Sequence, residues 1–242
     1  MNKNIVFVLL CILVLAFATG CQKADTTKTA TTQQTATAAQ QTQQTDDAKA
    51  ELKSLLSSKN SAEFKVEYNL ALDTEMQTQT GGSVKQSMKG TEVIAQKGKN
   101  TKIDVAQTIA GQFVTSTVYI LDGKMYTCAK LADKYNCFEG KETQESAQKS
   151  PEDIESSIDS YRIKASGQTT IAGETAKCYT IFAGQAAYDD LVMTECITSE
   201  GIPVSIKVTT GDGRYTYSLE AKSVVKKVED KEFELPVKPV SI

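Results

Sequence analysis

Hydrophobic positions change their spacing along the chain, and each spacing predicts a different element. Between 48 and 58, Leu52, Leu55 and Leu56 recur three and four residues apart, which predicts a short amphipathic helix. From 62 to 72, apolar residues occupy every second position, which predicts a strand with one buried and one solvated face. Further strands, mostly separated by turns, are predicted at 84–96, 101–107, 112–121, 125–128, 163–170, 175–183, 191–197, 204–210 and 215–225.

A second helix is predicted at 150–161, with Ser150 as its N-cap and Pro151 as its first helical residue. The predicted strands are short and mostly at hairpin distance, so they pair antiparallel, because parallel neighbours need longer crossovers. The pattern therefore predicts an α+β domain, mostly antiparallel β, with two short helices. The apolar stripe of the second helix consists of Ile154, Ile158 and Tyr161.

The N-terminus carries an apolar run, Ile5–Phe17, that follows a single cation, Lys3. Its 13 residues would span about 20 Å as a helix, less than the roughly 30 Å of a bilayer core. A cation, a short apolar run and small residues before Cys21 predict a secretory signal peptide at 1–20. The alternative interpretation is an uncleaved membrane anchor.

The end of this segment, Ala18-Thr19-Gly20-Cys21, resembles the lipobox of prokaryotic lipoproteins. Ala18 departs from the pattern, since Leu or Val is commoner there. The resemblance implies cleavage before Cys21 and attachment of lipid to its sulfur. The expected partner is therefore a membrane, and the expected location is the extracytoplasmic cell envelope.

Segment 22–47 consists mainly of Thr, Gln and Ala and contains no Val, Ile, Leu, Met or aromatic residue. Such a composition buries too little to offset the entropy of ordering, so we expect 21–47 to be a lipid-bearing, disordered tether. A coil of this length spans about 28 Å. O-linked sugar on its threonines is the alternative to a bare linker. The tether would hold a single β-rich globular domain, 48–242, away from the membrane.

Composition excludes several classes of function for this chain of 242 residues. With 27 Lys and Arg against 30 Asp and Glu, the net charge is -3, which argues against nucleic acid as a partner. The chain has no His, which removes imidazole-based triads and the commonest zinc sites. The acidic pairs at 152–153 and 189–190 fit helix-start charge and a solvated loop better than catalysis. We therefore expect no enzyme and no cofactor.

Four cysteines lie in the predicted domain, where an exported protein forms disulfides. Cys128 and Cys137 flank a predicted turn, and Cys178 and Cys196 lie on adjacent predicted strands. Of the three pairings available, we expect 128–137 and 178–196. The alternative, a four-thiolate metal site, is disfavoured because structural zinc sites use cysteines two to four residues apart. No metal is expected.

The second half of the predicted domain carries four short motifs, Thr170–Tyr179, Glu195–Ile197, Gly201–Ile206 and Asp230–Pro236. Through these motifs, residues 165–236 resemble the second half of LolA/LolB-like and LppX/LprG-type lipoproteins. The resemblance implies a curved half-barrel sheet with the two helices on its concave side. It also implies a non-catalytic protein with an apolar cavity that binds acyl chains.

This resemblance predicts a membrane-anchored lipoprotein that binds a lipid or other hydrophobic ligand between the sheet and its helices. The alternative is a surface lipoprotein with a structural or protein-binding role, whose groove is filled by Leu52, Leu55, Leu56, Ile154 and Ile158. The sequence identifies no protein partner. The expected lining residues are Phe64, Val66, Tyr68, Leu70, Val118 and Ile120.

Overall fold

The structure is a computed structural model. It describes residues 35–59, 61–77, 81–109, 111–131, 134–140, 158–182 and 191–241, with side chains from Asp46 onward. The predicted signal peptide, Cys21, the two acidic pairs at 152–153 and 189–190, and most of the predicted helix 150–161 lie outside these ranges.

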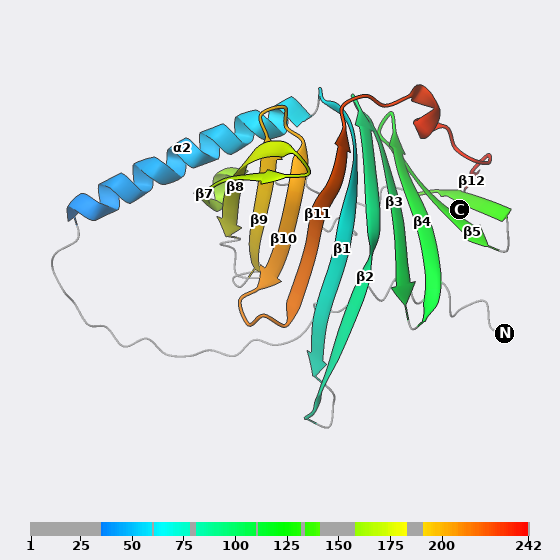
Figure 1. The fold of residues 1–242 in the computed structure, drawn as a ribbon, viewed down its shortest axis with the longest axis horizontal. Coiled ribbons are helices and arrows are strands. Elements are labelled where there is room, and N and C mark those ends of the chain that lie inside the picture. Colours follow the sequence, from blue (N-terminus) through cyan, green and yellow to red (C-terminus); the bar gives the residue numbers. More distant parts are fainter. Residues whose placement is uncertain are drawn as a thin grey trace.

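Within the described ranges, twelve strands form one sheet that curves across the molecule (Figure 1). The strand order is β12-β6-β5-β4-β3-β2-β1-β11-β10-β9-β8-β7, and every neighbouring pair is antiparallel except β12 and β6. The mostly antiparallel, curved sheet is therefore confirmed. The strands are β1 (Glu63–Gln77), β2 (Ser83–Lys97), β3 (Asn100–Ile109), β4 (Gln112–Leu121), β5 (Lys124–Leu131), β6 (Lys134–Glu139), β7 (Arg162–Ile171), β8 (Glu174–Phe182), β9 (Leu191–Thr198), β10 (Pro203–Thr210), β11 (Tyr215–Val225) and β12 (Val240–Ser241).

The helix α2 (Thr35–Lys59) is longer than predicted, because it begins inside the segment assigned to a disordered tether. Ala and Gln form helices readily, but an apolar stripe reveals only the part that contacts a core. The N-terminal part of α2 extends beyond the edge strand β7 (Figure 1). Among the described residues, no helix is both long and apolar enough to cross a membrane.

The predicted second helix is not confirmed. Its described end, Ile158–Ser160, is a single 3-10 turn, η1, and residues 151–157 are outside the described ranges. The side chain of Ile158 is fully buried and belongs to the same hydrophobic cluster as Leu52 and Leu56 of α2. This part of the predicted stripe therefore contacts the first helix.

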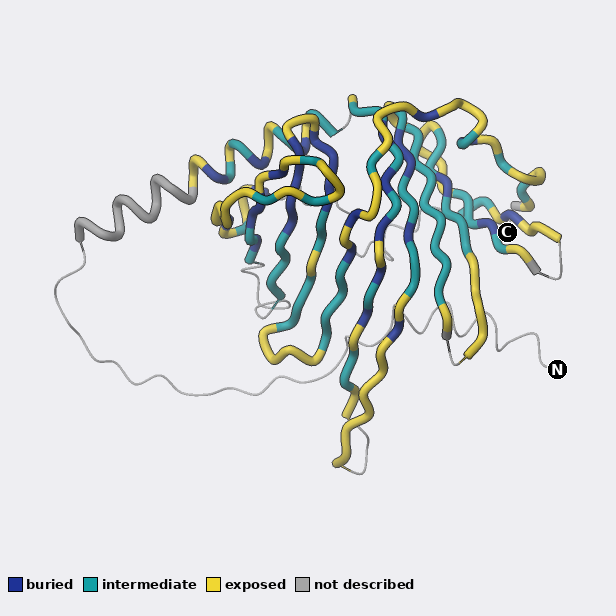
Figure 2. Tube along the Cα trace, viewed as in Figure 1, coloured by how far each residue is buried: buried dark blue, intermediate teal, exposed yellow. Residues whose placement is uncertain are grey.

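Register assigns the side chains of the sheet to two faces. Leu70, Ile206 and Tyr179 lie in one row that crosses β1, β11, β10, β9 and β8. Tyr179 packs in the same cluster as Leu52 and Leu56 of α2. The side of the sheet that carries this row is therefore the helix face. Buried positions alternate along β1, as an amphipathic strand requires (Figure 2).

A C-terminal segment, 228–235, crosses the opposite side of the sheet and includes the 3-10 turn η2 (Asp230–Phe233). Phe233 packs against β2, and Lys65 Nζ lies 2.6 Å from Glu232 Oε1. We call this segment the strap and the side that it covers the strap face.

Both predicted disulfides are present. Cys128 and Cys137 are direct partners on β5 and β6, with Cα atoms 4.1 Å apart. Cys178 and Cys196 are direct partners on β8 and β9, with Cα atoms 4.0 Å apart. The two bonds therefore stabilise separate pairs of neighbouring strands.

The end of α2 is fixed by the turn between β9 and β10. Gly201 has a φ of +83°, and a Cβ atom there would meet Lys59 N at 2.5 Å and Leu55 O at 2.7 Å. Gln96 Nε2 also donates a hydrogen bond of 2.6 Å to Lys59 O. These contacts require glycine in the turn and place the C-terminal end of the helix next to β2.

Candidate functional site

The six predicted lining residues share the helix face. Val66 and Val118 lie in one row across β1 to β4, with Ile94 and Ile103 between them. The neighbouring row joins Phe64 on β1 to Ile120 on β4 through the partners on β2 and β3. The alternation of apolar residues along β1 and β4 therefore identified side chains on the same side of the sheet, although these two strands are not adjacent.

Their burial divides these residues into two groups. Phe64, Val66 and Tyr68 are 0% exposed and Leu70 is 6% exposed, and all four belong to one hydrophobic core cluster. Val118 and Ile120 are only half-buried. The β1 residues therefore form the core of the sheet, whereas the β4 residues can still be reached from solvent.

Helix α2 fills the helix face over β7, β8 and β9. Ala48, Leu52 and Leu56 are buried in a cluster with Ile163 of β7 and Ile197 of β9. Leu55 is partly buried against the same cluster. The predicted plugging of the sheet by the first helix therefore occurs at this end, while Ile154 lies outside the described residues.

The other half of the helix face has a different surface. In the described part of the chain, the cluster that contains α2 includes no residue of β3, β4 or β5. Ile103 and Val105 of β3 are half-buried, and Val114 and Met125 of β4 and β5 are 39% and 42% exposed. Register places all four on the helix face. An apolar surface thus continues from the core of β1 to partly exposed side chains on β5.

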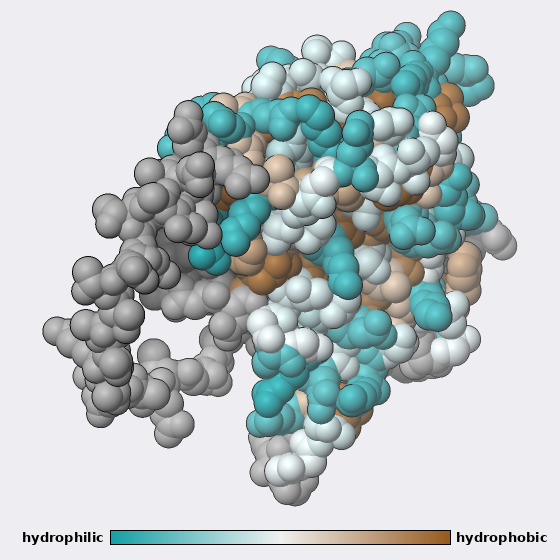
Figure 3. All heavy atoms as spheres, turned by 60° about the vertical axis from the view of Figure 1, so that its left-hand side comes forward, coloured by the Kyte–Doolittle hydropathy of each residue, from teal (hydrophilic) through white to brown (hydrophobic). Residues whose placement is uncertain are grey.

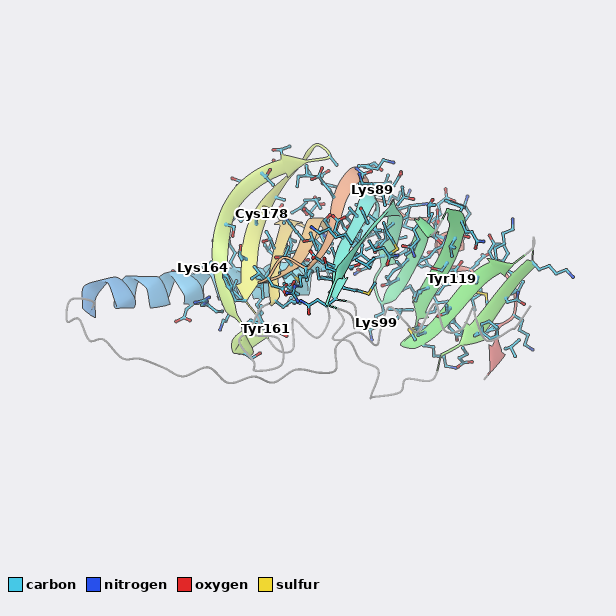
Figure 4. All side chains as sticks on the ribbon, turned by 90° about the horizontal axis from the view of Figure 1, so that it is seen from below. Lys89, Lys99, Tyr119, Tyr161, Lys164 and Cys178 are labelled. Carbon is cyan, nitrogen blue, oxygen red and sulfur yellow. A yellow bond between two sulfur atoms is a disulfide. The ribbon has the colours of Figure 1, made fainter. Side chains whose placement is uncertain are left out.

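Hydrophobic side chains also reach the molecular surface in patches between hydrophilic ones in the view of Figure 3. Figure 4 shows the curvature of the sheet from below, with the labelled residues Cys178 and Tyr119 on opposite halves. These two halves correspond to the part that α2 covers and the part that includes β4.

Two carboxyl groups lie buried on the helix face, and the sequence pattern did not identify them. Glu92 of β2 is 8% exposed and Glu195 of β9 is 3% exposed. Burial raises the pKa of both carboxyls; for Glu92, a hydrogen bond from Tyr217 Oη opposes the effect. The buried Tyr68 hydroxyl donates a bond of 2.6 Å to Pro203 O. No sequence signal distinguishes these acids from solvated strand residues.

A groove of about 660 Å³ lies on the strap face. It lies across β2 to β6 and was not predicted, because the expected cavity was on the helix side of the sheet. Most of its side chains come from positions that alternate with the helix-face residues. It is lined by Thr91, Val93, Asp104, Val105, Ala106, Phe113, Thr115, Ser116, Thr117, Cys128, Lys130 and Tyr135.

Three lysines connect the strap to the sheet. Lys65 and Lys102 lie 2.6 Å and 3.5 Å from the carboxylate oxygens of Glu232, and Lys97 Nζ lies 2.7 Å from Asp230 Oδ1. The hydrogen bond from Lys65 is the main reason that the pKa of Glu232 lies below its ordinary value. In the described residues, no group of three or more acidic or cysteine side chains is arranged to hold a metal ion.

No family model and no curated protein matches this chain. Among solved structures, it is similar to MucB, with a TM-score of 0.50 and 14% identity over 78% of this chain and 63% of MucB. At this identity the similarity shows a shared fold alone. The match spans less than two thirds of the length of MucB.

Two other solved structures are more distant. MucB in complex with the MucA periplasmic part has a TM-score of 0.48 and 12% identity over 81% of this chain and 63% of that chain. A LolA superfamily protein from Nitrosomonas europaea has a TM-score of 0.34 and 9% identity, over 75% of this chain and 96% of that one.

Proposed function

We propose that this chain is a non-catalytic lipoprotein of the cell envelope that binds a lipid or other hydrophobic ligand on the helix face of β2 to β5. Lipid on Cys21 would anchor it to a membrane. The observation that carries the proposal is the decrease in burial along one continuous apolar face. Val66 on β1 is 0% exposed, Val118 on β4 is half-buried, and Met125 on β5 is 42% exposed.

An apolar face that continues beyond the core suits a ligand with an apolar chain. Ligand sites are mostly apolar with a few placed polar groups, and extended exposed apolar patches mark interaction sites. Glu92 provides one polar group, since it lies directly opposite Val105 in the β2–β3 pair. Burial raises the pKa of Glu92, so this carboxyl is a poorly hydrated polar group beside the apolar surface.

Titration of the purified protein with a fluorescent fatty acid tests this proposal. We expect saturable binding with micromolar affinity or better, and loss of binding in Val118→Arg, which places a cation on the half-buried apolar surface. Val225→Arg is the matched control, because Val225 is 50% exposed and lies opposite Lys65, on the other side of the sheet. Unchanged thermal midpoints in both variants would separate loss of binding from loss of the fold.

A protein-binding role is the second candidate. The packing of α2 over β7 to β9 favours it, because buried side chains of the helix contact the sheet over that part of the helix face. MucB, a protein of similar fold, has been solved in complex with MucA. Wild-type protein that purifies free of lipid and does not bind the fatty acid would contradict the hydrophobic-ligand proposal and favour this second role.

A further inference from the structure

The strap-face groove lies on the side of the sheet away from the proposed hydrophobic site, and its chemistry is different. Its volume of about 660 Å³ falls within the range of small-molecule sites, roughly 300–1,000 Å³. The groove crosses five neighbouring strands, β2 to β6. At about 4.8 Å per strand it is long enough for a short linear molecule.

Hydroxyl groups line the floor of this groove. Thr91 and Thr115 lie in one row across β2, β3 and β4, with Ala106 between them. Thr117 occupies the next row on the same side and donates a hydrogen bond of 2.6 Å to Asp104 Oδ1. A threonine hydroxyl can both donate and accept hydrogen bonds, so these rows suit a ligand that carries many groups of the same kind.

The groove has one acidic and one basic side chain in its lining. Asp104 is the acidic residue of the lining and Lys130 the basic one. Asp104 Oδ2 also lies 3.0 Å from Lys102 Nζ, so its charge is compensated within the protein. A phosphate or other anion would need a cluster of cations, and a cationic ligand would need an uncompensated carboxylate. The lining therefore fits a neutral ligand.

Two aromatic rings add exposed flat surfaces to these hydroxyls. Phe113 is 72% exposed and Tyr135 is 45% exposed. Tyr135 lies directly opposite Lys130 in the β5–β6 pair, and Phe113 lies two residues before Thr115 on β4. The rings therefore lie on different strands of the same groove. A ring so exposed offers its face to a ligand rather than to the protein core.

We infer that the strap-face groove binds a neutral oligosaccharide. Sugar rings have apolar C–H faces, which stack on Phe113 and Tyr135, and hydroxyl edges, which pair with the threonine rows and Asp104. An acyl chain would leave these hydroxyls without partners, at a cost in binding free energy. The inference is independent of the proposed hydrophobic site, because the two sites use opposite sides of the sheet.

Calorimetric titration of the purified protein with the neutral hexasaccharides chitohexaose, cellohexaose, maltohexaose and laminarihexaose tests the inference. We expect binding of at least one of them. Phe113→Ala and Tyr135→Ala should each weaken that binding by tenfold or more. Met76→Ala is the control, because Met76 is 50% exposed on the β1–β2 hairpin and does not line the groove.

Thr117→Val tests the hydroxyl rows separately, since it keeps the shape of the side chain and removes the hydrogen bond to Asp104. It should weaken sugar binding while the protein remains folded, which a measurement of the thermal midpoint checks. Failure of all four sugars to bind at millimolar concentration would overturn the inference. So would binding that both aromatic variants retain, or a groove in which Phe113→Ala removes fatty-acid or peptide binding instead.

Discussion

At the scale of single residues, the two buried carboxyls are the least expected feature of the sheet. Glu92 and Glu195 are both less than 9% exposed on a face formed mostly by apolar side chains. Among the described residues, neither forms a salt bridge closer than 4.0 Å. A buried, ionised carboxylate loses contacts with water that the surrounding protein groups do not fully replace. Burial therefore raises the pKa of both carboxyl groups.

Because Glu195 lies in this environment, its contribution to the stability of the protein should depend on pH. Replacing Glu195 with glutamine should remove that contribution. Because the folded pKa of Glu195 is raised above the ordinary value of 4.5, its folded state binds a proton more tightly than its unfolded state. Its contribution to stability is therefore present below about pH 4.5 and is lost as the pH rises through the folded pKa. Urea unfolding should show Glu195→Gln gaining stability relative to wild type between pH 4 and pH 8.

Glu67→Gln provides the control for this experiment, since the Glu67 side chain is 40% exposed and paired with Lys222. Its stability relative to wild type should not increase over the same pH range. Wild-type protein that becomes more stable relative to Glu195→Gln as the pH rises would contradict the argument.

The sequence predicted correctly those features of the structure that depend on residues close to each other along the chain. Asp122-Gly123 forms the expected turn, with φ angles of +50° and +81°, and the cysteines pair as their strands suggested. Glu92 and Glu195 were not recognised because a polar residue in a strand is ordinarily assigned to the solvated face. Their burial follows from the register of β2 and β9, which no local pattern contains.

At the scale of elements, α2 depends on a small number of contacts with the sheet. Leu52 is 0% exposed and Leu56 is 5% exposed, whereas Leu55 is only partly buried. We expect Leu52→Ala to reduce the free energy of unfolding by about 2–5 kcal/mol, because it removes apolar contacts and leaves a cavity. Chemical denaturation measures this loss. Leu55→Ala should cost clearly less, and equal losses would contradict the described docking of the helix.

The strap depends on electrostatic contacts with the opposite side of the sheet. Lys65 and Glu232 are 38% and 24% exposed, so their pair should contribute roughly 0.2–1 kcal/mol. Because the pKa of Glu232 is lowered, this contribution is present above the ordinary value of 4.5 and is lost as the pH falls through the folded pKa. A double-mutant cycle of Lys65→Met and Glu232→Gln should show coupling at pH 7 that disappears well below pH 4.

Glu229→Gln is a suitable comparison for the strap, since Glu229 is two-thirds exposed and pairs with Lys231 of the same segment. It should have little effect on stability. Coupling between Lys65 and Glu232 that persists unchanged in strong acid would show that the charges are not responsible.

Hairpin spacing predicted ten of the elements, but three features needed more than spacing. β6 was not predicted, β12 has only two residues, and α2 extends through residues with no apolar stripe. The strap-face groove could not be predicted either. It requires side chains from five strands to align in rows, and the alternation within one strand does not determine the register of the next.

At the scale of the whole molecule, one curved sheet presents two sides with different chemistry. α2 covers part of the helix face, and the strap covers part of the strap face. Each covering element leaves the β3–β5 region of its side partly open, with apolar residues on one side and threonines with aromatic rings on the other. The proposed hydrophobic site and the proposed sugar site therefore lie on opposite sides of the sheet.

Attachment to a membrane is a property of the whole chain and depends on Cys21, which lies outside the described residues. We expect wild-type protein in a bacterial host with lipoprotein processing to sediment with membranes and to require detergent for release. Cys21→Ala should abolish this association or leave the precursor unprocessed, because one thiol carries the lipid and the start of the mature chain. Fractionation and mass spectrometry of the N-terminal peptide measure both effects.

Cys11→Ala is the matched control, because Cys11 is the other cysteine of the N-terminal region and lies in the segment that processing would remove. It should leave membrane association and the N-terminal modification unchanged. More than one acyl chain is needed for stable anchoring, so the modified peptide should carry two or more. A mature protein that begins at another residue, or that stays with the membrane in Cys21→Ala after cleavage, would contradict lipid attachment at Cys21. It would also contradict the role of 22–47 as a tether to a lipid anchor.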